Sequence, residues 1–305
     1  MRTKEISISG HPKNTVIAQL CKSFTDRNYE LACYYSVQMH CSNWMTDWWN
    51  SIIVYAAKNM SITNPKIGKF LYTIQSEYPS LKGNVRGNPV SIQETIALVV
   101  GVLTFSPKGV LFHVPKAMEH NECIKVLNTM EMTNIHFFVE KISLPSDPKL
   151  VLKIMSKFVE AIQKKFFQES LRILSLCMFL EREKNFKNLI VCGPRNWKQL
   201  NEKQKKDWVF LLWDVILNIS AQRKDLYEII SCWRTIYVDA YLSHRKTALL
   251  AIIVHSLILL TNPIDLSINV VNEENIIKKG CENIHFLYTD VAKRYERSQA
   301  LLQQR

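Results

Sequence analysis

Glycine is scarce in this sequence, with 8 residues among 305. An average protein is about 7% glycine, which would give roughly 21 residues here. Phosphate-binding loops, tight turns and barrel corners depend on glycine, and the chain contains neither a P-loop nor a GxGxxG motif. The GxSxG and HExxH motifs of hydrolases are also missing. These absences argue against large sheets, nucleotide-binding α/β folds and enzymes. They predict a mainly α protein with no catalytic residues and no cofactor.

Long apolar runs are missing too. The longest mainly apolar run, residues 248–260, spans 13 residues and contains His255 and Ser256. A membrane-spanning helix needs about 20 apolar residues, so we expect a buried core helix here and no membrane partner. The first residues lack the apolar stretch of a secretory signal peptide.

The eight cysteines form no CxxC pair. Cys21, Cys33, Cys177 and Cys232 lie among apolar residues at helical spacing, which is typical of free, buried thiols. Free thiols predict an intracellular, reducing compartment, either the cytoplasm or the nucleus.

Other clusters of chemically active side chains are weak. The spacing of His113, His120, Cys123 and His136 matches no standard zinc finger, so we expect no metal. The nearest carboxylate pair, Glu181 and Glu183, is interpreted as the solvated face of a charged helix end.

Prolines divide the chain almost in half. Two prolines flank a Ser-Asp pair at residues 143–148, which predicts a domain 1–142 and a basic domain 143–305. Each half is expected to hold a long amphipathic stretch, a tryptophan-bearing helix and an apolar helix closed by proline. This order suggests two similar helical units and the hypothesis of an internal duplication.

Helix signals are clear over most of the chain. The first long stretch has a break at residues 25–28, and Asn64 with Pro65 is typical of a helix start. Between residues 110 and 142, the β-branched and aromatic segments 110–114 and 135–139 predict a short β element, with a helical continuation as the alternative.

The formal net charge is +12, from 39 Lys and Arg against 27 Asp and Glu. Residues 147–206 hold 14 of the basic residues and 6 of the acidic ones, a net charge of +8. Basic side chains release counterions from phosphates, and aromatic side chains stack on unpaired bases. The segment therefore predicts binding of single-stranded or mixed DNA; the alternative is a solvated charged loop with its aromatic residues packed inward. The candidate contacts are Lys164, Lys165, Arg182, Lys184, Lys187, Arg195, Trp197, Lys198, Lys203, Lys205 and Lys206.

Three segments in the first half carry a family resemblance. They are residues 22–35 (KSFTDRNYELACYY), residues 56–65 (AAKNMSITNP) and residues 94–108, with ETIAL at the start and LTFSPK at the end. Their order and spacing resemble the C-terminal helical, clamp-loader-collar-like domain of the replication-associated recombination AAA+ ATPases (the RarA/MgsA group). The resemblance covers residues 14–109, a third of the chain, without the ATPase module that precedes this region in the family. Lys58 and Asn59 stand where the family has an acidic pair, and Ser61 stands where it has glycine.

The resemblance implies a collar that assembles subunits into an oligomer. Together with the basic segment, it leads to the hypothesis of a non-catalytic helical scaffold in DNA replication or repair. Such a scaffold oligomerises or binds partner proteins and contacts nucleic acid. The alternative is a transcription or regulatory adaptor with two cyclin-like repeats, for which we expect a monomer.

Overall fold

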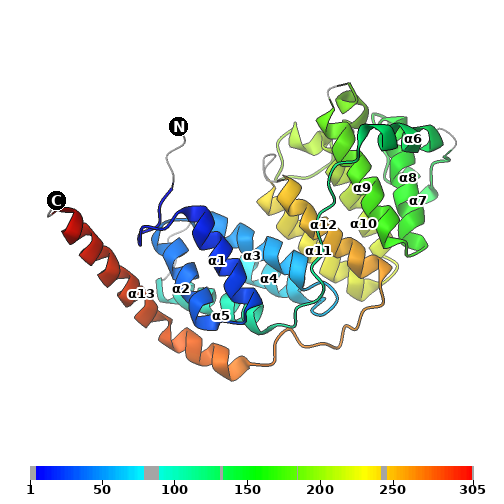
Figure 1. Ribbon diagram of the computed structural model, residues 1–305. Helices are drawn as coiled ribbons and strands as arrows, with labels where there is room; N and C mark the ends of the chain where they lie inside the picture. Colours follow the sequence, from blue (N-terminus) through cyan, green and yellow to red (C-terminus); the bar gives the residue numbers. More distant parts are fainter. Residues whose placement is uncertain (1–4, 79–88, 131–132, 184, 242–245, 304–305) are drawn as a thin grey trace. The chain divides into compact units, whose positions relative to one another are not determined.

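The protein is mainly α-helical, as the scarcity of glycine predicts (Figure 1). The computed structural model describes residues 5–78, 89–130, 133–183, 185–241 and 246–303. Within these ranges, an isolated bridge between Ile6 and Pro12 is the only strand-like pairing. The chain forms two compact units: unit 1 comprises Met1–Val110 and Leu266–Arg305, and unit 2 comprises Leu111–Asp265.

Unit 1 is built around α5, whose side chains Ile96, Val100 and Leu103 are fully buried. This helix packs against α1, α2 and α13. The tryptophans of α3 are core residues with satisfied ring nitrogens: Trp48 donates to Ser36 Oγ at 2.9 Å, and Trp49 donates to Gln75 Oε1 at 3.1 Å. The helices of unit 1 are α1 (Lys13–Thr25), α2 (Tyr29–Cys41), α3 (Met45–Asn59), α4 (Ile67–Glu77), α5 (Pro89–Phe105) and α13 (Glu274–Gln303).

Two of the few glycines let α13 close onto its neighbours. A Cβ atom on Gly101 of α5 would lie 2.7 Å from Cγ1 of Ile277. A Cβ atom on Gly280 of α13 would lie 2.2 Å from the hydroxyl oxygen of Tyr29, which donates a hydrogen bond to the carbonyl of Ala97. Such separations are far below van der Waals contact, so a side chain at either position would force Ile277 or Tyr29 to shift.

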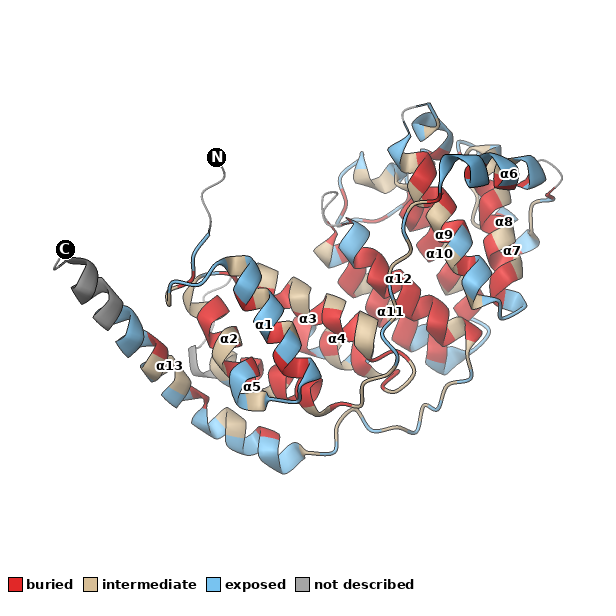
Figure 2. Ribbon diagram, viewed as in Figure 1, coloured by how far each residue is buried: buried red, intermediate tan, exposed pale blue. Residues whose placement is uncertain are grey.

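Unit 2 is built around α12, which packs against α8, α9, α10 and α11. Both His255 and Ser256 are fully buried, and Figure 2 shows that buried residues dominate this helix. The prediction of a core helix over residues 248–260 is therefore confirmed. The elements of unit 2 are α6 (His120–Met130), α7 (Phe137–Glu140), α8 (Lys149–Gln163), α9 (Phe167–Arg182), the 3₁₀ turns η2 (Lys187–Ile190) and η3 (Gln204–Lys206), α10 (Trp208–Ser220), α11 (Lys224–Ala240) and α12 (Lys246–Thr261). In the described part of the chain, no helix combines the length and apolarity that crossing a membrane requires.

The domain boundary expected at residues 142 and 143 lies inside unit 2. The proline-flanked segment joins α7 to α8. It is anchored by Asp147, which accepts hydrogen bonds from the backbone of Leu144 at 2.7 Å and Gly193 at 2.8 Å. A segment held this way is a structural loop rather than a linker. The duplication of the two halves stays a prediction.

The expected β element is wrong for the described residues between 110 and 142, which contain no strand. Residues 110–114 have no neighbouring strand to pair with, and Phe112 instead packs edge-on against Phe167 at 5.6 Å. Residues 135–139 turn into α7, because His136 Nδ1 accepts from the backbone nitrogen of Phe138 and caps this short helix.

Candidate functional site

The structure divides the predicted basic segment between the two ends of α9. Lys164 and Lys165 are exposed in the turn before α9, whereas Arg182 and the residues that follow it lie at the far end. Because α9 has 16 residues and a helix rises 1.5 Å per residue, the two groups are about 24 Å apart along its axis. The basic residues therefore form two separate surfaces rather than one.

Arg195 is buried, with 5% of its surface exposed. Its Nη2 atom lies 2.5 Å from Asp147 Oδ2, and its Nη1 atom donates to the carbonyl of Ile142 at 2.6 Å. A buried charge pair of this kind holds the loop after α9 against the loop before α8. The prediction that Arg195 contacts nucleic acid is therefore wrong, because the guanidinium is committed to a carboxylate inside the protein.

Trp197 is also a core residue, with 7% of its surface exposed. Its ring packs against Phe210 at 5.4 Å and against the Arg234 guanidinium at 4.3 Å. The predicted stacking of Trp197 on a base is wrong as well, since the indole is buried against side chains of the protein. Trp197 therefore fits the alternative interpretation of the sequence, in which the aromatic residues of this segment pack inward.

The other predicted residues that the structure describes are at or near the surface. Arg182 and Lys198 are exposed, Lys205 pairs with Glu202 at 2.7 Å, and Lys184 lies outside the described residues. Three lysines, Lys187, Lys203 and Lys206, line one cavity of about 520 Å³ at the end of α9. None of these three forms an ion pair with any residue that the structure describes. We call this cavity the α9 pocket; it is also lined by Glu181, Ile190, Val191, Asn201, Gln204, Asp207, Trp208 and Tyr241.

Four of the lining residues belong to a network of charged and polar side chains around Lys246, which does not itself line the pocket. We call this network, Glu181, Asp207, Trp208 and Tyr241 with Lys246, the floor of the pocket. The Lys246 ammonium lies 2.8 Å from Glu181 Oε1 and 2.6 Å from Asp207 Oδ1, and it sits 4.4 Å from the ring centre of Trp208. Trp208 Nε1 donates to Glu181 Oε2 at 3.2 Å, and the Tyr241 hydroxyl donates to Asp207 Oδ2 at 2.5 Å. Burial raises the pKa of Tyr241, so its hydroxyl stays protonated and keeps donating.

Local sequence explains how this network forms. Asp207 is the N-cap of α10 and accepts from the backbone of Val209 at 3.1 Å, which fixes its carboxylate. Glu181 is the residue that the sequence assigns to a solvated face, and it is instead half-buried against Lys246, while Glu183 is exposed. No local pattern joins these residues, because they come from the ends of three different helices.

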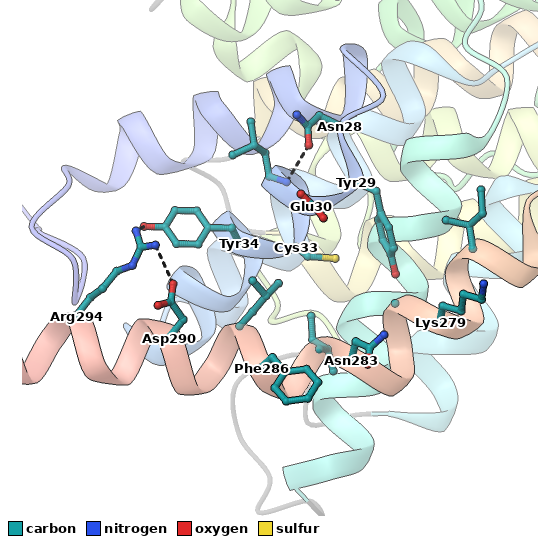
Figure 3. Close-up of a pocket in the computed structure, with 15 residues that line it drawn as sticks. Asn28, Tyr29, Glu30, Cys33, Tyr34, Lys279, Asn283, Phe286, Asp290 and Arg294 are labelled. Carbon is teal, nitrogen blue, oxygen red and sulfur yellow. Dashed lines mark hydrogen bonds and ion pairs between the residues drawn. The ribbon is translucent and has the colours of Figure 1, made fainter.

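Unit 1 contains a second cavity, of about 620 Å³, between α2 and α13 (Figure 3). Leu31 and Phe286 line it with 45% and 63% of their surfaces exposed. At one end, Arg294 pairs with Asp290 at 2.8 Å and reaches the hydroxyl of Tyr34 at 3.5 Å. We call this cavity the α2–α13 groove; large apolar side chains exposed together in this way are typical of protein-binding surfaces.

Two of the four candidate metal ligands have other partners. His120 packs against Phe179 at 5.8 Å, and His136 caps α7. In the described part of the chain, no group of three or more His, Cys, Asp or Glu side chains is arranged to hold a metal ion. All eight cysteines are free thiols.

Comparisons with protein-family models, curated proteins and solved structures found no match to this chain.

Proposed function

We propose that this protein is a non-catalytic helical scaffold of DNA replication or repair. Its unit 2 contacts single-stranded nucleic acid through the α9 pocket, and its unit 1 self-associates. The observation that carries the nucleic-acid part is the convergence of Lys187, Lys203 and Lys206 on one cavity. None of the three forms an ion pair with a described residue. Unpaired lysines are the side chains that gain most from a phosphate, because no internal ion pair has to be broken first.

The self-association part rests on unit 1. The segments that resemble the collar domain of the replication-associated ATPases lie in α1 to α5, all of them in unit 1. The same unit exposes Phe286 and Leu31 in the α2–α13 groove, where a second copy could cover them. Covering such apolar side chains contributes about 25 cal/mol for each Å² removed from water.

Anisotropy of a labelled single-stranded oligonucleotide over a salt series tests the nucleic-acid part. We expect binding at low salt that weakens as salt increases. Binding that is undetectable at low salt, or unchanged by salt, would contradict the proposal.

Size-exclusion chromatography with light scattering tests self-association. We expect the wild-type protein to be an oligomer and Phe286→Ser to shift it towards the monomer, because this side chain is 63% exposed in the groove. Phe166→Ser is the matched control, since Phe166 is 59% exposed but belongs to unit 2. A wild-type monomer would contradict self-association and favour the adaptor with two cyclin-like repeats.

A further inference from the structure

The α9 pocket has opposite charges at its rim and its floor. Its three lining lysines are exposed and form no ion pair with a described residue; we call them the rim. At the floor, two carboxylates share the single ammonium of Lys246. The rim attracts an anion, whereas the floor carries a net negative charge. A ligand that satisfies both needs an anionic group and, a few Å away, a hydrogen-bond donor.

Two carboxylate oxygens of the floor accept fewer hydrogen bonds than they can. A carboxylate oxygen can accept about two hydrogen bonds. From the described residues, Glu181 Oε1 accepts one, from Lys246, and Asp207 Oδ2 accepts one, from Tyr241. The other two oxygens, Glu181 Oε2 and Asp207 Oδ1, each accept two. Counted over the described residues alone, the floor therefore has two vacant acceptor positions.

The donors of the floor are already used. Lys246 has three N–H bonds, and it makes three contacts, two to Glu181 and one to Asp207. The Trp208 indole and the Tyr241 hydroxyl each donate to one of the same carboxylates. A ligand group at the floor is therefore expected to donate hydrogen bonds, because the donors of Lys246, Trp208 and Tyr241 are all engaged.

These features discriminate between classes of polyanion. An acidic peptide would satisfy the lysines of the rim, but its carboxylates would meet Glu181 and Asp207 at the floor. A nucleotide with an exocyclic amino group carries a phosphate for the rim and N–H donors for the floor. Carboxylates read such amino groups at the edges of bases, as when Asp or Glu accepts from the amino group of cytosine.

The size and lining of the pocket fit one unstacked nucleotide. A cavity of about 520 Å³ lies within the usual range of small-molecule sites. Val191 lines it with 43% of its surface exposed and supplies apolar contact for the face of a base. The acceptors are held in place, because the side chains of Lys246 and Asp207 are only 8% and 14% exposed.

We propose that the α9 pocket holds a single unpaired base with an exocyclic amino group, while its lysines contact the adjoining phosphates. This inference rests on the proposed contact with nucleic acid and adds selectivity among bases to it. Proteins that bind single strands splay bases out and read their edges in this way. The protein would then prefer cytosine, adenine or guanine to thymine or uracil.

Oligo-dC and oligo-dU of about 12 nucleotides provide the test, because cytosine has an amino group at ring position 4 where uracil has a carbonyl. Uracil keeps one N–H donor, at N3, which lies between two carbonyl groups that a carboxylate repels. For the full-length wild-type protein, we expect oligo-dC to bind about 5- to 10-fold more tightly at equal salt, the effect of one hydrogen bond to a charged acceptor. Glu181→Gln should bring the ratio to one or below, since its amide can donate to the carbonyl of uracil. Glu183→Gln is the matched control at the same end of α9, where the side chain is exposed, and should leave the ratio unchanged.

The outcomes separate the two proposals. Equal affinity of the wild-type protein for both oligonucleotides, or tighter binding of oligo-dU, would overturn the base selectivity and leave the contact with nucleic acid standing. An unchanged ratio in a helical Glu181→Gln variant, checked by circular dichroism, would also overturn it. No binding of either oligonucleotide at low salt would overturn both proposals. The wild-type comparison needs no variant, so it decides even if Glu181→Gln fails to fold.

Discussion

Removing two lysines from the α9 pocket should change the salt dependence of DNA binding. For single strands, the slope of log K against log salt is about −0.7 per phosphate neutralised. With Lys187, Lys203 and Lys206 each neutralising one phosphate, the wild-type slope should be about −2. Affinity would then fall about 20-fold between 50 and 200 mM salt.

The double variant Lys203→Gln/Lys206→Gln leaves one of these contacts. Its slope should be about −0.7, so the same salt increase should weaken binding only about 3-fold. Neither lysine forms an ion pair with a described residue, and Lys203 and Lys206 are exposed, so the free energy of unfolding should change by less than about 0.5 kcal/mol. The measurement is anisotropy of a labelled single strand at a series of KCl concentrations.

The control variant is Lys164→Gln/Lys165→Gln. It removes the same charge from exposed positions at the other end of α9, about 24 Å away. We expect its slope to equal that of the wild-type protein. Equal slopes in the two double variants would refute the assignment of phosphate contacts to the α9 pocket.

Three further predictions concern the stability of the fold. Arg195→Met leaves a buried carboxylate without its partner and should lower the free energy of unfolding by about 3–5 kcal/mol, measured with urea. Gly280→Ala places a methyl group against the Tyr29 hydroxyl and should cost about 1–3 kcal/mol in the same assay, whereas a neutral effect would contradict the close approach of α13. Burial raises the pKa of Asp214 to about 6, against the pull of nearby arginines. Because the folded pKa exceeds the unfolded value of about 3.9, the ionisation of Asp214 should remove stability from the wild-type protein as the pH rises from about 4 to 6. Asp214→Asn should reduce that loss, and thermal unfolding at several pH values measures the difference.

Local sequence predicts those parts of the fold that depend on local signals. The break at residues 25–28 separates α1 from α2, as expected. Asn64, however, does not begin a helix; α4 begins at Ile67. The Asn64 amide instead donates to Ser106 Oγ at 3.0 Å and to the carbonyl of Val270 at 2.8 Å. Partners 42 and 206 residues away cannot be read from a capping pattern.

In the candidate site, too, local sequence predicts some features, whereas contacts between residues far apart in the chain are missed. Composition located the segment that holds Lys187, Lys203 and Lys206, because an excess of charge is visible in any window of sequence. Composition could not distinguish these exposed lysines from Arg195, whose charge is paired with buried Asp147, 48 residues earlier in the chain. The floor of the pocket was missed for the same reason, since Glu181 and Lys246 are 65 residues apart.

The connectivity of unit 1 has a consequence for biosynthesis. Its last helix, α13, follows the whole of unit 2 in the chain, although it covers α5. During synthesis, α1 to α5 therefore emerge before unit 2. Until α13 is made, the face of α5 that α13 covers stays exposed. Unit 2 is continuous in sequence and can fold in the meantime, since domains generally fold as units. Translation that ends before residue 274 yields a chain in which unit 2 is complete and unit 1 lacks α13, so that apolar surface of α5 is exposed. For this protein, termination between unit 2 and α13 is therefore expected to promote aggregation rather than to act as a mild truncation.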